Sequence, residues 1–119
     1  MQRELGDRFG QAATLDSIAV AHRSLARYRE ATAWYQQALQ VNREFGDRYN
    51  EAKTLVFLGD TSLAADDLES AVTFWQDAVT VFDDLGLADA ADLRAKLSSV
   101  AARTSGAIAD DRARVPSAT

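Results

Sequence analysis

Apolar residues recur along most of the chain at steps of three and four positions, with polar residues between them. The spacing is clear in residues 12–25 and 28–45, and it returns from Leu55 to Leu63 and from Leu68 to Leu85. Such spacing places the apolar side chains on one face of an α-helix. No stretch alternates with a period of two, as a half-buried strand does. The pattern therefore predicts an all-α fold.

The chain also repeats itself with a step of forty residues. Gly6-Asp7-Arg8 recurs as Gly46-Asp47-Arg48, and Gly86 follows another forty residues on. Each unit holds two helical stretches with a short connection, which makes consecutive helices antiparallel. The sequence therefore predicts stacked helical hairpins.

Residues suited to helix ends stand between these stretches. A carboxylate that accepts from orphan backbone N–H groups is expected at the N-caps Asp7, Asp47 and Asp67. A residue with positive φ is expected after the helices, at Gly6, Gly46 and Gly86.

Twelve positions in the two units hold the small and large apolar side chains on which hairpin packing would depend. They are Leu15, Ile18, Ala19, Ala31, Tyr35 and Ala38 in the first unit, and Leu55, Leu58, Gly59, Ala71, Trp75 and Ala78 in the second. This arrangement resembles the tetratricopeptide repeat, with its signature W-x2-L-G-x2-Y, A-x3-F, A and P. The chain departs from that signature because Leu replaces the Trp, His22 or Ser62 replaces the Tyr, the closing Pro is absent, and the unit has forty residues.

The resemblance implies a right-handed solenoid of antiparallel hairpins, with about five helices and a short N-terminal remnant. The expected repeat domain is 1–105, divided into a remnant of a preceding repeat (1–8), two repeats (9–46 and 47–86) and a capping helix (87–105) that starts from Asp89 as its N-cap. Residues 106–119 lack periodicity and are expected to form a disordered tail. The forty-residue form with Gly-Asp-Arg is similar to repeats of bacterial regulators that follow an NB-ARC-like ATPase domain.

Composition narrows the possible functions. The chain has no Cys and one His, so zinc sites built on Cys, disulfides and thiol catalysis are excluded. Thirteen basic and eighteen acidic residues give a net charge of −5, which disfavours direct nucleic-acid binding. The first ten residues lack the apolar core of a secretory signal, and no run approaches the ~18 apolar residues of a membrane span. A cytoplasmic protein that does not bind membranes is expected.

The candidate catalytic and metal-binding residues lack the neighbouring groups that such sites need. His22 is interpreted as a packed, hydrogen-bonded core residue, because no nucleophile and base accompany it. The pairs Asp66-Asp67, Asp83-Asp84 and Asp110-Asp111 fit capping and solvation better than metal binding, since adjacent helical side chains diverge by about 100°. Trp75 is expected in the core, whereas Trp34 fits either the core or a half-exposed site. No phosphate-binding glycine loop occurs. We therefore expect no enzyme activity, cofactor or metal.

The remaining hypothesis is a binding surface for a protein or peptide. The first helix of each hairpin lines the concave side of such a solenoid, and the resemblance implies partner contacts there. The expected contact residues are Asp16, Val20, Arg23, Lys53, Val56, Asp60 and Leu63. Arg23 and Lys53 could pair with a partner carboxylate, or the four charged residues could pair with one another. An alternative function is homodimerisation through apolar surface exposed on the first hairpin.

Overall fold

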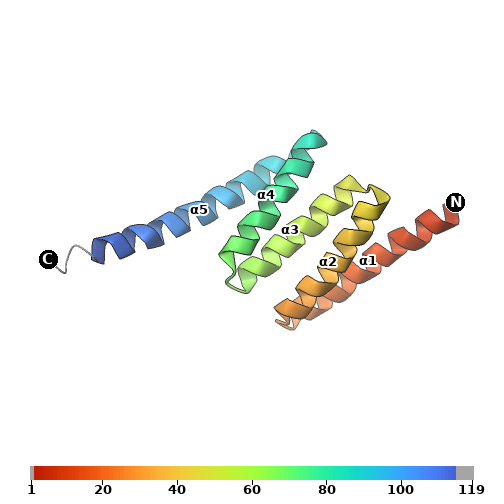
Figure 1. The fold of residues 1–119 in the computed structure, drawn as a ribbon, viewed down its shortest axis with the longest axis horizontal. Coiled ribbons are helices and arrows are strands. Elements are labelled where there is room, and N and C mark those ends of the chain that lie inside the picture. Colours follow the sequence, from red (N-terminus) through yellow and green to blue (C-terminus); the bar gives the residue numbers. More distant parts are fainter. Residues whose placement is uncertain (1, 115–119) are drawn as a thin grey trace.

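The computed structural model describes the backbone of residues 2–114 and the side chains of residues 10–102. Within this part the chain forms five α-helices and no strand (Figure 1). They are α1 (Gln2–Ser24), α2 (Tyr28–Phe45), α3 (Arg48–Ala64), α4 (Leu68–Asp84) and α5 (Asp89–Arg114). The predicted all-α fold is confirmed.

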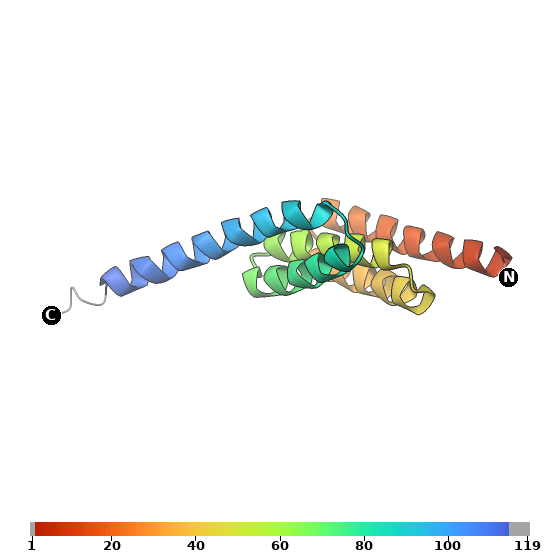
Figure 2. The same cartoon turned by 90° about the horizontal axis from the view of Figure 1, so that it is seen from above.

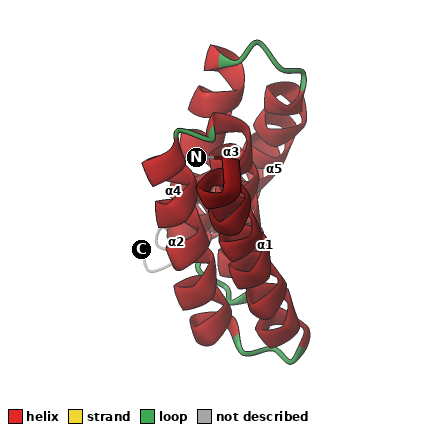
Figure 3. Ribbon diagram, turned by 90° about the vertical axis from the view of Figure 1, so that its right-hand side faces the viewer, coloured by secondary structure: helices red, strands yellow, loops and turns green. Residues whose placement is uncertain are grey.

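The helices zigzag between two layers. Each one packs against its neighbours in the chain, α1 on α2, α2 on α3, α3 on α4 and α4 on α5. Figures 2 and 3 show α1, α3 and α5 in one layer and α2 and α4 in the other. The array is elongated, with extents of 71 × 34 × 18 Å. These features are those of stacked helical hairpins.

All four turns between the helices have the same backbone geometry, and they recur every twenty residues. The residues in the left-handed conformation are Ala26 (φ 58°), Gly46 (68°), Asp66 (62°) and Gly86 (68°). After each of them, the next backbone N–H donates to the carbonyl five residues earlier, at 2.8 or 2.9 Å. This is the Schellman closure of a helix C-terminus. The two glycine turns were predicted, whereas the Ala26 and Asp66 turns were not.

Of the N-caps predicted at Asp7, Asp47 and Asp67, the last two are confirmed. The backbone N–H of Asn50 donates to Asp47 Oδ1 at 3.2 Å, and that of Ser70 donates to Asp67 Oδ1 at 3.1 Å. Hydrogen bonds from Ser70 lower the pKa of the Asp67 carboxyl. The prediction at Asp7 was wrong, because this residue lies inside a helix.

The beginning of the chain differs from expectation. Helix α1 runs without a break from Gln2 to Ser24, so residues 1–8 hold no separate helix end and Gly6 is not a C-terminal cap. The physical reason is that one glycine does not end a helix when the residues on both sides of it continue the helix. Extending α1 through one glycine costs only about 1 kcal/mol.

The last helix also differs from expectation. It begins at Asp89, which is therefore the first helical residue and not the N-cap that the sequence predicts, and it continues to Arg114. Residues 106–114 are thus helical rather than a disordered tail. Lengthening an existing helix needs no new nucleus, and this segment is rich in Ala and Arg, which favour helix. The prediction of a tail rests on the missing apolar period alone and does not include this helix propensity. Residues 115–119 lie outside the described part of the chain.

The core combines fully buried alanines with buried aromatic rings. Tyr35 and Trp75 are the largest buried side chains. Of the twelve signature positions, Ile18 is half-buried and the other eleven are buried. Leu25 and Leu85 extended the predicted apolar stripes, but they are 64% and 41% exposed. Both lie in turns, where the helical period no longer applies.

The contact between Gly59 and Trp75 sets how closely α3 and α4 approach. A Cβ atom at Gly59 would lie 2.3 Å from Cδ1 and Nε1 of the indole, far inside van der Waals contact. The corresponding pair forty residues earlier is Ala19 and Tyr35, both fully buried. The unit with the larger ring therefore carries the residue without a side chain.

We predict that Gly59→Ala destabilises the chain by about 1–3 kcal/mol, because the added methyl group overpacks the indole. The matched control is Gly10→Ala, which lies in a helix with nothing within 4 Å of the new Cβ. That variant should gain about 0.5–1 kcal/mol from helix propensity. Adding Trp75→Tyr to Gly59→Ala reproduces the first unit's pair and should recover part of the loss. Urea unfolding measures all three variants, and a Gly59→Ala chain as stable as the wild type would contradict the assigned contact.

Candidate partner-binding face

The seven predicted contact residues lie on two helices of the same layer. Three lie on α1 and four on α3, two of the three helices in the layer shown in Figure 2. We call the solvent side of this layer the α1–α3–α5 face. None of the seven residues is fully buried. Val20, Arg23 and Lys53 are exposed, and Asp16, Val56, Asp60 and Leu63 are half-buried.

Two unpartnered polar atoms lie near the junction of α1 and α3. The Asp16 Oδ1 atom is buried and accepts no hydrogen bond from the described residues. Burial raises the pKa of the Asp16 carboxyl to about 6, and the positive charge of Lys53 opposes that rise. The hydroxyl of Tyr35 is also buried without a partner among the described residues. Burial raises its pKa, and the charge of Arg23 opposes the rise.

The four charged residues predicted on this face do not form ion pairs with one another within the described part of the chain. Instead, Asp60 Oδ1 lies 3.4 Å from Lys96 Nζ of α5. Lys53 Nζ lies 5.5 Å from the centre of the Tyr49 ring, a cation–π distance. Lys96 makes a second such contact, with its Nζ 5.7 Å from the centre of the Trp75 ring.

A pocket of about 230 Å³ opens between α3 and α5. Its apolar wall consists of Val56, Phe57, Phe82 and Leu93. Its charged rim consists of Lys53, Asp89, Asp92 and Lys96. A pocket of this size is smaller than most small-molecule sites, and it suits one large side chain of a partner. We call it the α3–α5 pocket.

Of the eight residues that line this pocket, only Lys53 and Val56 are among the contact residues predicted from the sequence. The contribution of α5 was missed, although Asp89, Asp92 and Lys96 recur at the three- and four-residue steps that mark one helical face. A second indication in the sequence is that α5 follows two complete hairpins and therefore takes the place of the first helix of a third hairpin, as α1 and α3 do in the first two. Helix α5 was interpreted as a capping helix with a solvated outer side.

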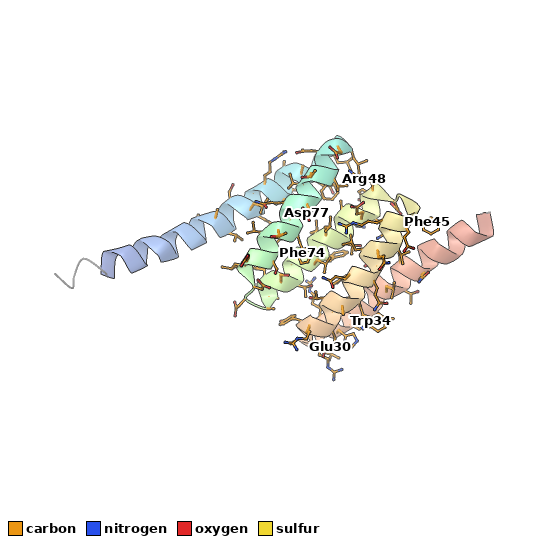
Figure 4. The ribbon with its side chains drawn as sticks, in the orientation of Figure 1. Glu30, Trp34, Phe45, Arg48, Phe74 and Asp77 are labelled. Carbon is orange, nitrogen blue, oxygen red and sulfur yellow. The ribbon has the colours of Figure 1, made fainter. Side chains whose placement is uncertain are left out.

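His22 packs against an aromatic ring but is half-buried rather than a core residue, and it makes no hydrogen bond of the predicted kind with the described side chains. It is half-buried and stacks on half-buried Trp34 of α2, with ring centroids 6.4 Å apart and planes 10° apart. Its Nδ1 atom is buried and has no partner among the described residues. Figure 4 shows Trp34 on α2 and Phe74 at the matching place on α4. Both rings pack against the edge of the core.

Three of the four paired aspartates whose side chains are described have structural contacts. Asp67 caps α4, Asp83 pairs with Arg94, and Asp84 lies 2.9 Å from Arg48. The side chains of residues 110 and 111 lie outside the described part. Among the side chains that the structure describes, no group of three His, Asp or Glu residues could hold a metal ion. No described helix is long and apolar enough to cross a membrane.

The sequence profile of the tetratricopeptide repeat matches residues 10–84, which is more than half of the chain. The chain belongs to the tetratricopeptide repeat family. Repeats of this family generally mediate protein–protein interactions, and the fold is typically non-catalytic. No curated protein matches the chain at a significant level. The matched residues end at the last residue of α4, so α5 lies beyond them.

We predict that Asp16→Asn stabilises the chain near pH 7 by about 1 kcal/mol, a figure reduced for the half-exposed carboxylate. The pKa of this group rises from 3.8 to about 6 on folding, so wild-type stability falls as the pH rises through that window. The gain from the variant should therefore vanish below about pH 4. Thermal unfolding across this pH range measures the effect, with Asp77→Asn on α4 as the control for loss of one negative charge. A gain that does not change with pH would contradict this origin.

Proposed function

We propose that the chain is a non-catalytic interaction module that holds a protein or peptide segment on its α1–α3–α5 face. The observation that carries the proposal is the α3–α5 pocket, an apolar depression with charged residues around it. It lies on the same face as Val20, which is 48% exposed. An apolar centre within a polar rim is the usual anatomy of a protein interface.

Tight helix packing supports this proposal. Five alanines at signature positions are fully buried, and the Gly59–Trp75 contact leaves no freedom between α3 and α4. A partner segment would therefore meet a preformed surface, and the module itself would lose little conformational entropy on binding.

We further propose that the module is part of a larger cytoplasmic regulator of transcription or signalling, with bacterial regulators as the nearest pattern. The support is the forty-residue unit with its repeated Gly-Asp-Arg segment at residues 6–8 and 46–48. A reading frame that encodes a nucleotide-binding ATPase domain ahead of Met1 would support this context, and an unrelated neighbouring domain would contradict it.

We predict that Val56→Glu strongly weakens peptide binding on this face. Random peptides displayed on phage are selected on the immobilised chain, and the affinities of the enriched peptides are measured for the wild type and the variant. A charged side chain in the apolar wall should weaken binding at least about tenfold, since it removes apolar burial and places a charge in the contact. Thr80→Glu, which adds the same charge at an exposed site on α4, should leave binding unchanged. Peptides that bind both variants like the wild type would place the binding surface elsewhere.

Self-association is the alternative function, and exposed apolar residues on the first hairpin favour it. Val20 is 48% exposed and Leu25 is 64% exposed. Two copies related by a two-fold axis could bury these side chains against each other. We predict for this alternative that sedimentation velocity detects a dimer as the concentration rises, and that Val20→Glu together with Leu25→Glu restores the monomer. A wild-type chain that stays monomeric at high concentration would remove the alternative.

A further inference from the structure

We propose that the α3–α5 pocket selects partner segments in which a bulky apolar side chain stands next to Lys or Arg. This inference rests on the proposed function, and it adds the chemistry of the partner.

The apolar half of the inference comes from the shape and lining of the pocket. Its volume of about 230 Å³ matches one large side chain, and four of its eight lining residues are aliphatic or aromatic. Phe82 and Leu93 are themselves buried and hold the wall in place, and Val56 and Phe57 are half-buried. An aliphatic or aromatic anchor in such a pocket contributes most of the binding energy of a small interface.

The basic half comes from the charges on the rim that have no partner. The two lysines already have local contacts, Lys96 with Asp60 and the Trp75 ring, and Lys53 with the Tyr49 ring. Asp89 and Asp92 are exposed and form no ion pair with the described residues. Lys53 forms no ion pair with the described residues either, but when Asp60 is counted the two lysines and three aspartates leave a net charge of 2 − 3 = −1 beside the pocket.

Asp89 and Asp92 differ from other first-turn acids in their place on the rim of a pocket, because Glu30 of α2 and Glu69 of α4 also form no ion pair with the described residues. Glu51 in the first turn of α3 lies 3.3 Å from Arg43 and 3.9 Å from Arg48. Asp89 and Asp92 occupy the first turn of α5 without any such cation. They complement the helix dipole, but that interaction leaves their outer oxygens open to a Lys or Arg of the partner.

The net charge of the chain acts in the same direction. At −5 it attracts basic segments and repels acidic ones over the range of the local screening length. The two grooves that Phe74 lines on the opposite layer are larger, at about 570 and 560 Å³, but most of the side chains that line them are polar. Figure 4 shows Phe74 on α4. The observations therefore favour a basic and apolar segment on the α3–α5 pocket.

The test repeats the phage selection on the full chain and compares the composition of the enriched peptides. We expect Lys or Arg within a few positions of Leu, Ile, Phe or Trp. Synthetic copies of these peptides should bind about five- to tenfold more weakly to the double variant Asp89→Asn/Asp92→Asn, as the loss of two exposed ion pairs predicts. The matched control is Glu69→Gln/Asp77→Asn, which changes the net charge equally on exposed sites of α4 and should leave binding unchanged.

The possible outcomes separate this inference from the proposed function. Enriched peptides that need Val56 but carry acidic residues or no charge would overturn the basic preference and leave the proposed function standing. Basic peptides that bind equally to both double variants would also overturn it, since the charge would then act only through the whole molecule. If no peptide depends on Val56, both the inference and the proposed function fail. A second double variant, Asp89→Lys/Asp92→Lys, should reverse the selection toward Glu and Asp, and an unchanged selection would count against the inference.

Discussion

The spacing of the helices depends on aromatic rings that occupy the space a neighbouring side chain would need. At Gly59 the indole of Trp75 lies where a Cβ atom would be, so α3 and α4 approach more closely than any other residue at position 59 allows. The same indole lies 5.7 Å from Lys96 Nζ, which also reaches Asp60. A single buried ring therefore determines the packing of α3 on α4 and contacts the helix that forms the far wall of the α3–α5 pocket. The geometry of the candidate site therefore depends on the packing of the core.

The backbone is more regular than the sequence that forms it. The sequence repeats every forty residues, but the left-handed turn residue recurs every twenty, at Ala26, Gly46, Asp66 and Gly86. Ala26 carries a conformational cost of about 1 kcal/mol that glycine would avoid, and Asp66 carries a smaller one because Asp tolerates the left-handed region. The packing of each hairpin imposes the same turn regardless of the residue available. The structural unit of this array is thus one helix and its turn, whereas the sequence shows only the pair.

The sequence predicted those features that depend on one helix at a time. The local signals are the spacing of apolar residues, the small residues and the helix caps. Ala31 and Ala71 are buried as expected, and Asp47 and Asp67 cap their helices as expected. The features that it missed depend on what lies across a gap between helices. The burial of Asp16 Oδ1 and the pairing of Asp60 with Lys96, thirty-six residues away, involve neighbours that no periodicity identifies. Leu25 was misplaced because the pattern does not show where a helix gives way to a turn.

The repeats and α5 contribute different parts of the pocket. The residues that match the family end with α4, and they supply the scaffold together with one wall of the pocket. Helix α5 is held on α4 by the buried residues Ala90, Leu93 and Val100 and by the Arg94–Asp83 pair. It supplies the other wall and both uncompensated carboxylates. Repeats with a shared signature build similar frames, so selectivity for a partner must come from positions that the signature leaves free. Under the proposed function, those positions are the ones where α5 faces α3.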